Sequence, residues 1–156
     1  MSAIRQMMAT EMITASPDET VATVAGRMCR NRVGAVLVVR DGVLLGLFSE
    51  RDLLVRVIAE NRSPSEVVVG EVATADVLTV NVDQPVKEML RLFREKRFRH
   101  LPVMEGGKPV GILSTRDLLE RSVDALESFI ERKAYGGDLK DGADPYDHFG
   151  GAYTTS

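Results

Sequence analysis

The spacing of apolar residues predicts a short strand followed by a helix near the start of the chain. Residues 13–15, Ile-Thr-Ala, favour an extended conformation. The apolar residues that follow recur at helical spacing, at Val21, Val24, Ala25 and Met28. Asp18 stands before them, where a residue that caps the first turn is expected.

Two buried strands and a second helix are predicted next. Residues 35–39 and 44–48 form apolar runs, and the Asp41-Gly42 pair between them is a strong hairpin signal. Ser49 then opens a second helix, which gives the element order β-α-β-β-α.

The same order occurs twice, because residues 4–54 recur without a gap at 69–119. The repetition is clearest where Gly46-Leu47-Phe48-Ser49-Glu50-Arg51-Asp52 returns as Gly111-Ile112-Leu113-Ser114-Thr115-Arg116-Asp117. In the second copy Asp83 is the expected helix cap, Pro85 lies just inside the helix start, and Gly106-Gly107 is the hairpin signal. A repeat of about fifty residues buries too little surface to be comfortably stable alone. The sequence therefore predicts an α+β fold in which two repeats pack as one module.

Five segments follow from this pattern. We predict a first repeat at 4–60, a linker at 61–68, a second repeat at 69–123, a C-terminal helix extension at 124–135 and a flexible tail at 136–156. The net charge of −3 is uneven, because residues 124–156 hold seven acidic residues against three basic ones. This balance does not favour general nucleic-acid binding.

Composition bounds the setting and the chemistry. The single cysteine, Cys29, excludes an intramolecular disulfide, and its place on the apolar side of a helix predicts a buried thiol in a reducing, cytoplasmic setting. No apolar run is long enough to cross a membrane, and no signal-peptide pattern is seen. The two histidines and one cysteine form no metal-binding spacing, and no nucleophile–base pair or phosphate loop can be recognised. We therefore expect a protein that is not an enzyme and that needs no cofactor or metal.

These repeats resemble a tandem pair of CBS domains, often called a Bateman module. The resemblance covers residues 4–123 and rests on Thr14 and Thr79, the hairpin glycines, and the Gly-x-x-Ser-x-Arg-Asp ending of each copy. Residues 99–103, Arg-His-Leu-Pro-Val, also resemble the second repeat of such proteins. The resemblance implies two repeats related by a pseudo-twofold axis with packed sheets. It also implies homodimers and adenosine-containing ligands bound in the clefts between repeats.

The Ser-x-x-Asp motifs have two compatible interpretations. As a capping box, Ser49 and Ser114 would only start helices, with Asp52 and Asp117 reaching back to them. The resemblance implies that the serine also binds a phosphate and that the aspartate binds the ribose hydroxyls. Arg51 or Arg116 would then balance the phosphate charge. The full set of predicted nucleotide-binding residues is Thr14, Ala35, Val36, Ser49, Arg51, Asp52, Thr79, His100, Leu101, Pro102, Ser114, Arg116 and Asp117.

The clefts should differ in affinity, and one of them can be vacant. Leu37 takes the place of Pro102, and Gly34-Ala35 that of Arg99-His100, so the apolar slots for adenine are unlike. Arg97 and Arg99 belong to a basic cluster that either is a solvated helix end or guides a di- or triphosphate into the cleft.

We interpret the chain as a regulatory sensor of adenosine nucleotides (AMP, ADP or ATP) that signals to an unidentified protein partner. The alternatives are another adenosyl ligand, S-adenosylmethionine or NAD(H), and a ligand-free structural or adaptor dimer. Nucleic-acid binding is a minor alternative, and no membrane partner is expected. The apolar residues left over for a homodimer interface are Met7, Met8, Leu54, Val57, Ile58 and Leu119.

Overall fold

The structure is a computed structural model that describes residues 2–96 and 99–136, with side chains up to residue 132. The chain divides into two compact units, Met1–Leu118 and Leu119–Ser156. Both sheets lie in the first unit, and so do the residues discussed below for the candidate site.

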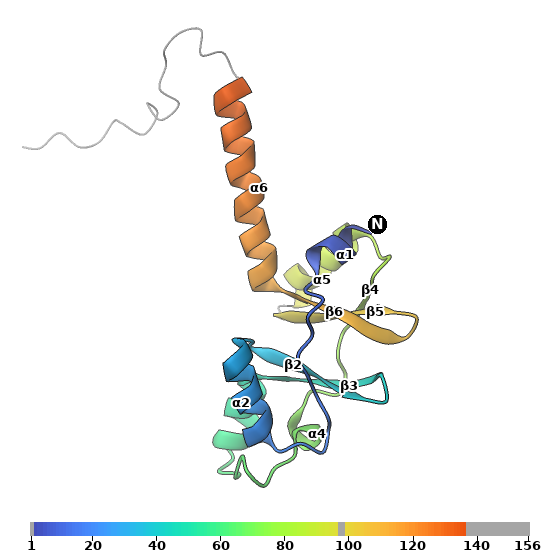
Figure 1. Ribbon diagram of the computed structural model, residues 1–156, viewed down its shortest axis with the longest axis vertical. Helices are drawn as coiled ribbons and strands as arrows, with labels where there is room; N and C mark the ends of the chain where they lie inside the picture. The colour runs from blue at the N-terminus through green and yellow to red at the C-terminus, as the bar shows by residue number, and fades with distance from the viewer. Residues whose placement is uncertain (1, 97–98, 137–156) are drawn as a thin grey trace, which may run out of the picture. The chain divides into compact units, whose positions relative to one another are not determined.

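The first repeat forms a three-stranded mixed sheet with helices, and its elements follow the predicted order (Figure 1). Its elements are β1 (Thr14–Ala15), α2 (Val21–Asn31), β2 (Ala35–Arg40), β3 (Val43–Ser49), α3 (Glu50–Leu53) and the π-helix η1 (Leu54–Ile58). Strand β1 pairs in parallel with β2, and β2 pairs in antiparallel with β3.

The second repeat has the same sheet order and the same pairing directions. Its elements are α4 (Val69–Val72), β4 (Val80–Asn81), α5 (Val86–Lys96), β5 (His100–Glu105), β6 (Lys108–Ser114) and α6 (Thr115–Gly136). The expected β-α-β-β-α order is therefore confirmed in both copies, and the helix predicted after Asp117 runs to Gly136.

Both predicted hairpin turns are present. Asp41 and Gly42 have φ angles of 51° and 77°, and Gly106 and Gly107 have φ angles of 55° and 79°. Two successive left-handed residues match the right-handed twist of the flanking strands.

The helix caps differ from the sequence prediction. The α2 helix is capped by Thr20, whose hydroxyl accepts from the Thr23 N–H, while Asp18 forms an ion pair with Arg40. The α5 helix begins at Val86, so Pro85 lies immediately before it and Asp83 lies in the preceding turn. Polar residues shortly before a helix also form turns and ion pairs, so a position close to the helix start was not enough to identify the capping residue. The thiol expected to be buried, Cys29, is exposed on the surface of α2.

Each repeat is completed by the segment at the start of the other one. Ile4 of the short helix α1 (Ala3–Met7) and Met8 immediately after it belong to a hydrophobic cluster of the second repeat. Their partners there include Val82, Met89 and Leu101. Figure 1 shows α1 beside α5 at the second sheet. In return, Val67, Val69 and Val72 pack in the cluster of the first repeat. The two repeats therefore share their cores through exchanged segments and form one module.

The exchanged segments pair with the last strand of each sheet. Ala9 forms a β-bridge with Ile112 on β6, and Thr74 forms the equivalent bridge with Leu47 on β3. A glycine stands immediately before each bridging strand residue, Gly46 before Leu47 and Gly111 before Ile112. A Cβ atom on Gly46 would lie 2.8 Å from the Thr74 carbonyl oxygen, and one on Gly111 would lie 2.9 Å from the Ala9 carbonyl oxygen. The glycines recur because only a residue without a side chain admits the crossing segment.

Within residues 2–96 and 99–136, no helix has both the length and the apolar character needed to cross a bilayer. The predicted flexible tail lies outside the described residues from position 137 on.

Candidate functional site

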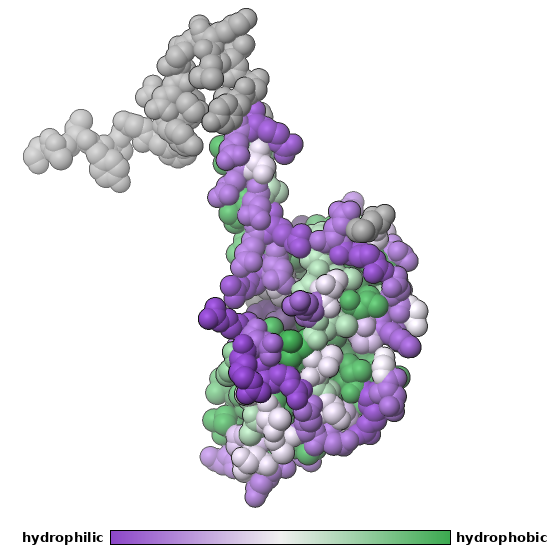
Figure 2. All heavy atoms as spheres, viewed as in Figure 1, coloured by the Kyte–Doolittle hydropathy of each residue, from purple (hydrophilic) through white to green (hydrophobic). Residues whose placement is uncertain are grey.

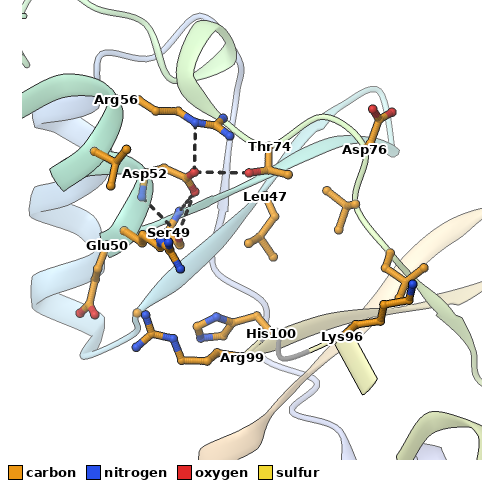
Figure 3. A pocket seen from close by; sticks show the side chains of 15 residues that line it. Leu47, Ser49, Glu50, Asp52, Arg56, Thr74, Asp76, Lys96, Arg99 and His100 are labelled. Atoms are coloured by element: carbon orange, nitrogen blue, oxygen red, sulfur yellow. Dashed lines mark hydrogen bonds and ion pairs between the residues drawn. The ribbon is translucent and has the colours of Figure 1, made fainter. Parts of the chain in front are cut away.

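A cavity of about 590 Å³ lies between the two repeats (Figure 3). The first repeat lines it with strand β3 and helices α3 and η1, and the second repeat lines it with the segment before β4 and the ends of α5 and β5. Its lining residues are Gly34, Leu47, Ser49, Glu50, Arg51, Asp52, Val55, Arg56, Thr74, Asp76, Val77, Leu78, Lys96, Arg99 and His100. Every position comes from the first unit of the chain.

Ser49 and Asp52 form a complete capping box at this cavity. The Ser49 N–H donates to Asp52 Oδ2 at 2.8 Å, and the Ser49 hydroxyl donates to the same oxygen at 2.7 Å. The Asp52 N–H donates back to Ser49 Oγ at 3.4 Å. The structural interpretation of this motif is therefore confirmed, and the box also places both side chains at the cavity wall.

The second Asp52 oxygen is held by the other repeat and by η1. The Thr74 hydroxyl donates to Asp52 Oδ1 at 3.3 Å, and Arg56 Nε lies 3.6 Å from the same oxygen. Arg56 also donates to the Val72 carbonyl oxygen at 2.9 Å. Among the described residues, Asp52 is the one charged residue that is buried, with 7% of its surface exposed. These contacts explain how a buried carboxylate is tolerated, because every Asp52 oxygen has a donor or a positive charge.

Cations outnumber anions along the cavity wall. The cavity is lined by four basic side chains, Arg51, Arg56, Lys96 and Arg99, and by three carboxylates, Glu50, Asp52 and Asp76. Arg51 comes from the same helix as the capping box, whereas Lys96 and Arg99 come from the second repeat. Figure 3 shows His100 and Arg99 on the opposite side of the cavity from Ser49 and Asp52. An anionic group bound here would meet positive charge from both repeats.

His100 is half-buried, and its surroundings disfavour the charged imidazolium. Burial lowers the pKa of His100 most, and the positive charge of Arg99 lowers it further, while Glu50 and Asp117 act in the opposite direction. His100 therefore senses a carboxylate from each repeat.

We expect this histidine to make the fold less stable in mild acid. Because the unfolded state takes up the proton more readily, the free energy of unfolding should begin to fall below about pH 6.5, the ordinary histidine pKa. The loss should stop growing once the pH is below the lowered pKa of His100 in the folded state. Urea titrations at several pH values between about 7.5 and about 5, on both sides of the ordinary histidine pKa, check this. If His100→Gln showed the same pH dependence as the wild type, another group would be responsible.

The cavity gathers only some of the residues predicted to bind a nucleotide. Ser49, Arg51, Asp52, Arg99 and His100 line it. The remaining described residues of the predicted set do not line it: Thr14, Ala35, Val36, Thr79, Leu101, Pro102, Ser114, Arg116 and Asp117. Arg97 lies outside the described residues. Contacts between a ligand and the residues away from this cavity stay predictions.

The strand pattern explains part of this division. Val36 and Leu101 belong to the hydrophobic clusters of the first and second repeat, so their side chains are in separate cores. Ala35 and Pro102 are also buried. Thr14 is exposed in β1, and Thr79 is half-buried immediately before β4.

Ser114, Arg116 and Asp117 occupy the place in the second repeat that Ser49, Arg51 and Asp52 occupy in the first. The capping bond is kept, because the Asp117 N–H donates to Ser114 Oγ at 3.0 Å. The preceding backbone contact is kept too. The Glu50 N–H donates to the Gly34 carbonyl at 3.0 Å, and the Thr115 N–H donates to the Arg99 carbonyl at 3.0 Å.

Sequence reasoning missed the part of the cavity that comes from outside the repeated motif. Thr74, Val77 and Leu78 lie in the segment before β4, and Arg56 and Val55 lie in η1. Thr74 gave no signal by repetition because its equivalent is Ala9. Arg56 could have been found by its spacing, because a residue four positions after Asp52 lies on the same helix face.

Within the described residues, no group of three or more His, Cys, Asp or Glu side chains is placed to hold a metal ion. The arrangement combines a fixed carboxylate acceptor, a serine hydroxyl, several cations and an apolar wall formed by Leu47, Val77 and Leu78. These are the elements of a binding site for an anionic ligand that carries hydroxyl groups and an apolar ring.

Comparisons with known proteins agree with the repeat structure. The family described as CBS domain matches twice, at residues 4–59 and 69–124. MK0525 of Methanopyrus kandleri is 33% identical over 112 residues, which cover 70% of this chain and 57% of that protein. The chain therefore spans little more than half the length of this relative.

Solved structures share the fold. A putative signal-transduction protein with CBS domains from Burkholderia ambifaria MC40-6 has a TM-score of 0.72 at 30% identity, over 80% of this chain and 95% of that one. CBSX2 in complex with AMP has a TM-score of 0.68 at 23% identity, over 80% of this chain and 98% of that one. Because the family matches both repeats and the fold is that of CBS-pair structures, this chain belongs to the CBS-domain family as a tandem pair.

Proposed function

We propose that the cavity binds an adenosine nucleotide, AMP, ADP or ATP, and that the protein is a regulatory sensor of that ligand. The observation that carries the proposal is the Ser49–Asp52 box at the wall of a cavity that cations from both repeats line. Regulation is the role of CBS pairs in general. The AMP complex of CBSX2 supports the ligand class, because that protein shares the fold.

The phosphate would bind beside Ser49. The Ser49 hydroxyl can donate to a phosphate oxygen in place of Asp52, and Arg51 and Arg99 can form charge-assisted hydrogen bonds from opposite sides of the cavity. In this role Arg99 matches the phosphate-facing residue predicted from the sequence. His100 lies beside it, so a bound phosphate would raise the lowered pKa of its imidazole.

The ribose and the base would occupy the rest of the cavity. Asp52 can accept both sugar hydroxyls, because its carboxylate is already fixed in one orientation. Leu47, Val77 and Leu78 offer an apolar surface for the adenine ring, and the backbone of the segment before β4 offers hydrogen bonds at its edge. This places the base against different residues from those that the sequence predicted.

Ligand binding is expected to stabilise the protein. At about one hundred times its dissociation constant, the true ligand should add about 2.7 kcal/mol to the free energy of unfolding. A thermal-shift screen of AMP, ADP, ATP, S-adenosylmethionine and NADH tests this and separates the adenosyl alternatives.

The site assignment is tested in the same assay. Asp52→Asn keeps the shape but removes a charged acceptor worth about 1.5–3 kcal/mol, so it should weaken binding at least tenfold. Asp83→Asn is the matched control, because Asp83 is exposed and does not line the cavity. If none of the five compounds shifts the melting temperature at millimolar concentration, the adaptor interpretation replaces the sensor.

A route from ligand to partner starts at η1. Val55 and Arg56 of η1 line the cavity, while Leu54, Val55 and Ile58 expose apolar surface. A ligand that prefers one arrangement of η1 would change the surface offered to a partner. The identity of the regulated protein and the compartment stay predictions.

We further propose that the protein forms a homodimer through apolar surface. Leu54, Ile58 and Leu119 are exposed by 50–65%, as expected for interface residues. The expectation was wrong for Met8 and Val57, which are buried in the two cores. Helix α6 adds a row of exposed apolar side chains that Figure 2 shows along it, comprising Val123, Leu126, Phe129 and Ile130. Light scattering at roughly tens of micromolar protein should give twice the mass of one chain. A monomer at that concentration would contradict the proposal.

A further inference from the structure

We infer that each chain holds one nucleotide, in the cavity at Asp52, and that the equivalent cleft at Asp117 is left vacant because Ala9 stands in the place of Thr74. The inference rests on the proposed function and refines it. It concerns how many ligands bind and which residue decides between the two clefts.

The pseudo-symmetry of the backbone defines the equivalent positions. The bridge between Thr74 and Leu47 on β3 corresponds to the bridge between Ala9 and Ile112 on β6. The backbone hydrogen bonds of these pairs are 2.9 Å in the first repeat, and 2.9 Å and 3.0 Å in the second. Ala9 is therefore the residue that approaches the second Ser-x-x-Asp motif in the way that Thr74 approaches the first.

The two carboxylates differ in what can orient them. Asp52 Oδ2 accepts from the Ser49 backbone and hydroxyl, and Oδ1 accepts from the Thr74 hydroxyl at 3.3 Å. The bond from Thr74 is the contact that reaches this carboxylate from across the repeat boundary. Ala9 has no hydroxyl, so residue 9 cannot give Asp117 the equivalent bond.

A carboxylate that is fixed before the ligand arrives binds a ribose diol more tightly, because little freedom is lost on binding. Thr74 thus acts as a positioning residue for Asp52. With Oδ1 held by Thr74 and Oδ2 held by Ser49, the carboxylate keeps one orientation.

Other exchanges favour the same cleft. Lys96 adds a positive charge to the first cavity, and its equivalent Asn31 is neutral. His100 adds a polar ring there, and its equivalent is Ala35. Glu50 works in the other direction, since its equivalent Thr115 is neutral. Arg51 and Arg99 line the same cavity as Glu50, so positive charge still outweighs its carboxylate.

Titration calorimetry with AMP and with ATP on the full chain tests the inference. We expect one ligand per chain, loss of binding in Asp52→Asn, and unchanged binding in Asp117→Asn. Two ligands per chain, or equal effects of the two substitutions, would overturn the inference while leaving the proposed function intact. No binding of either nucleotide would refute the proposed function itself.

Thr74 and Ala9 provide the matched test of cause. Thr74→Val removes the hydroxyl at nearly constant size and should weaken binding about tenfold, the lower range for a hydrogen bond to a charged group. Thr74→Ser should restore affinity, a result that a purely structural role for the methyl group would not give.

Ala9→Thr should create the missing bond. Ala9 is exposed, so a larger side chain can be accommodated there. A second binding event should then appear at millimolar ligand, and it should be removed again by Asp117→Asn. If Ala9→Thr still binds one nucleotide, and Thr74→Val binds as tightly as the wild type, Thr74 does not decide between the clefts.

Discussion

Ile4→Ala is expected to lower the free energy of unfolding by about 2–5 kcal/mol, as large-to-small substitutions in a core do. Ile4 is the third residue of the described chain, yet none of its surface is exposed. Its side chain packs with Val82, Met89 and Leu101, which are all in the second repeat. A segment that comes first in the sequence therefore belongs energetically to the last half of the module.

Chemical denaturation measures the effect of Ile4→Ala, and Leu90→Ala is the matched control. Leu90 is 47% exposed on α5, so shortening its side chain should cost far less. Equal destabilisation by the two substitutions would show that α1 does not complete the second core. Hydrogen exchange adds the location, because β5 and β6 should lose protection before β2 and β3.

The second large effect is expected at Gly46. In Gly46→Ala the new Cβ would lie 2.8 Å from the Thr74 carbonyl oxygen, a backbone atom that can move only with its segment. Pushing this segment away should cost about 1–3 kcal/mol, the range for overpacked sites. It should also weaken nucleotide binding, because Thr74 would be drawn away from Asp52.

Gly26→Ala is the control with the same chemical change. In α2 the added Cβ would meet only the end of the Arg30 side chain, at 3.4 Å. Replacing a helical glycine by alanine should stabilise the protein by about 0.5–1 kcal/mol. Substitutions of opposite sign at two glycines, measured by urea titration, would separate the close approach at Gly46 from ordinary backbone entropy. A neutral Gly46→Ala would mean that the crossing segment is free to shift.

Local sequence patterns were sufficient for the elements of each repeat. Alternation and run length give β2, β3, β5 and β6, and the pairs at 41–42 and 106–107 give both hairpin turns. These features depend on neighbours within a few residues, so the chain itself contains the information. The repeat offset then relates Ser49 to Ser114 and Asp52 to Asp117 without any structure.

Helix caps and the exposure of Cys29 were beyond such patterns. Asp18 has the residue type of a good cap, but its carboxylate forms an ion pair with Arg40 at the end of β2. Thr20 caps the α2 helix instead. Cys29 lies next to Met28 on α2, and only the packing decides which of the two faces the core.

By itself, the sequence determined the doubled β-α-β-β-α order, the family, and the Ser49–Asp52 and Ser114–Asp117 motifs. Only the tertiary structure decided that α1 completes the second core, that Thr74 crosses over Gly46 to reach Asp52, and that Arg56, Lys96 and His100 share one cavity. The physical reason is that these contacts join segments far apart in the chain. Their partners are chosen by packing and by the pairing of the crossing segments with β3 and β6, which no periodicity within one repeat encodes.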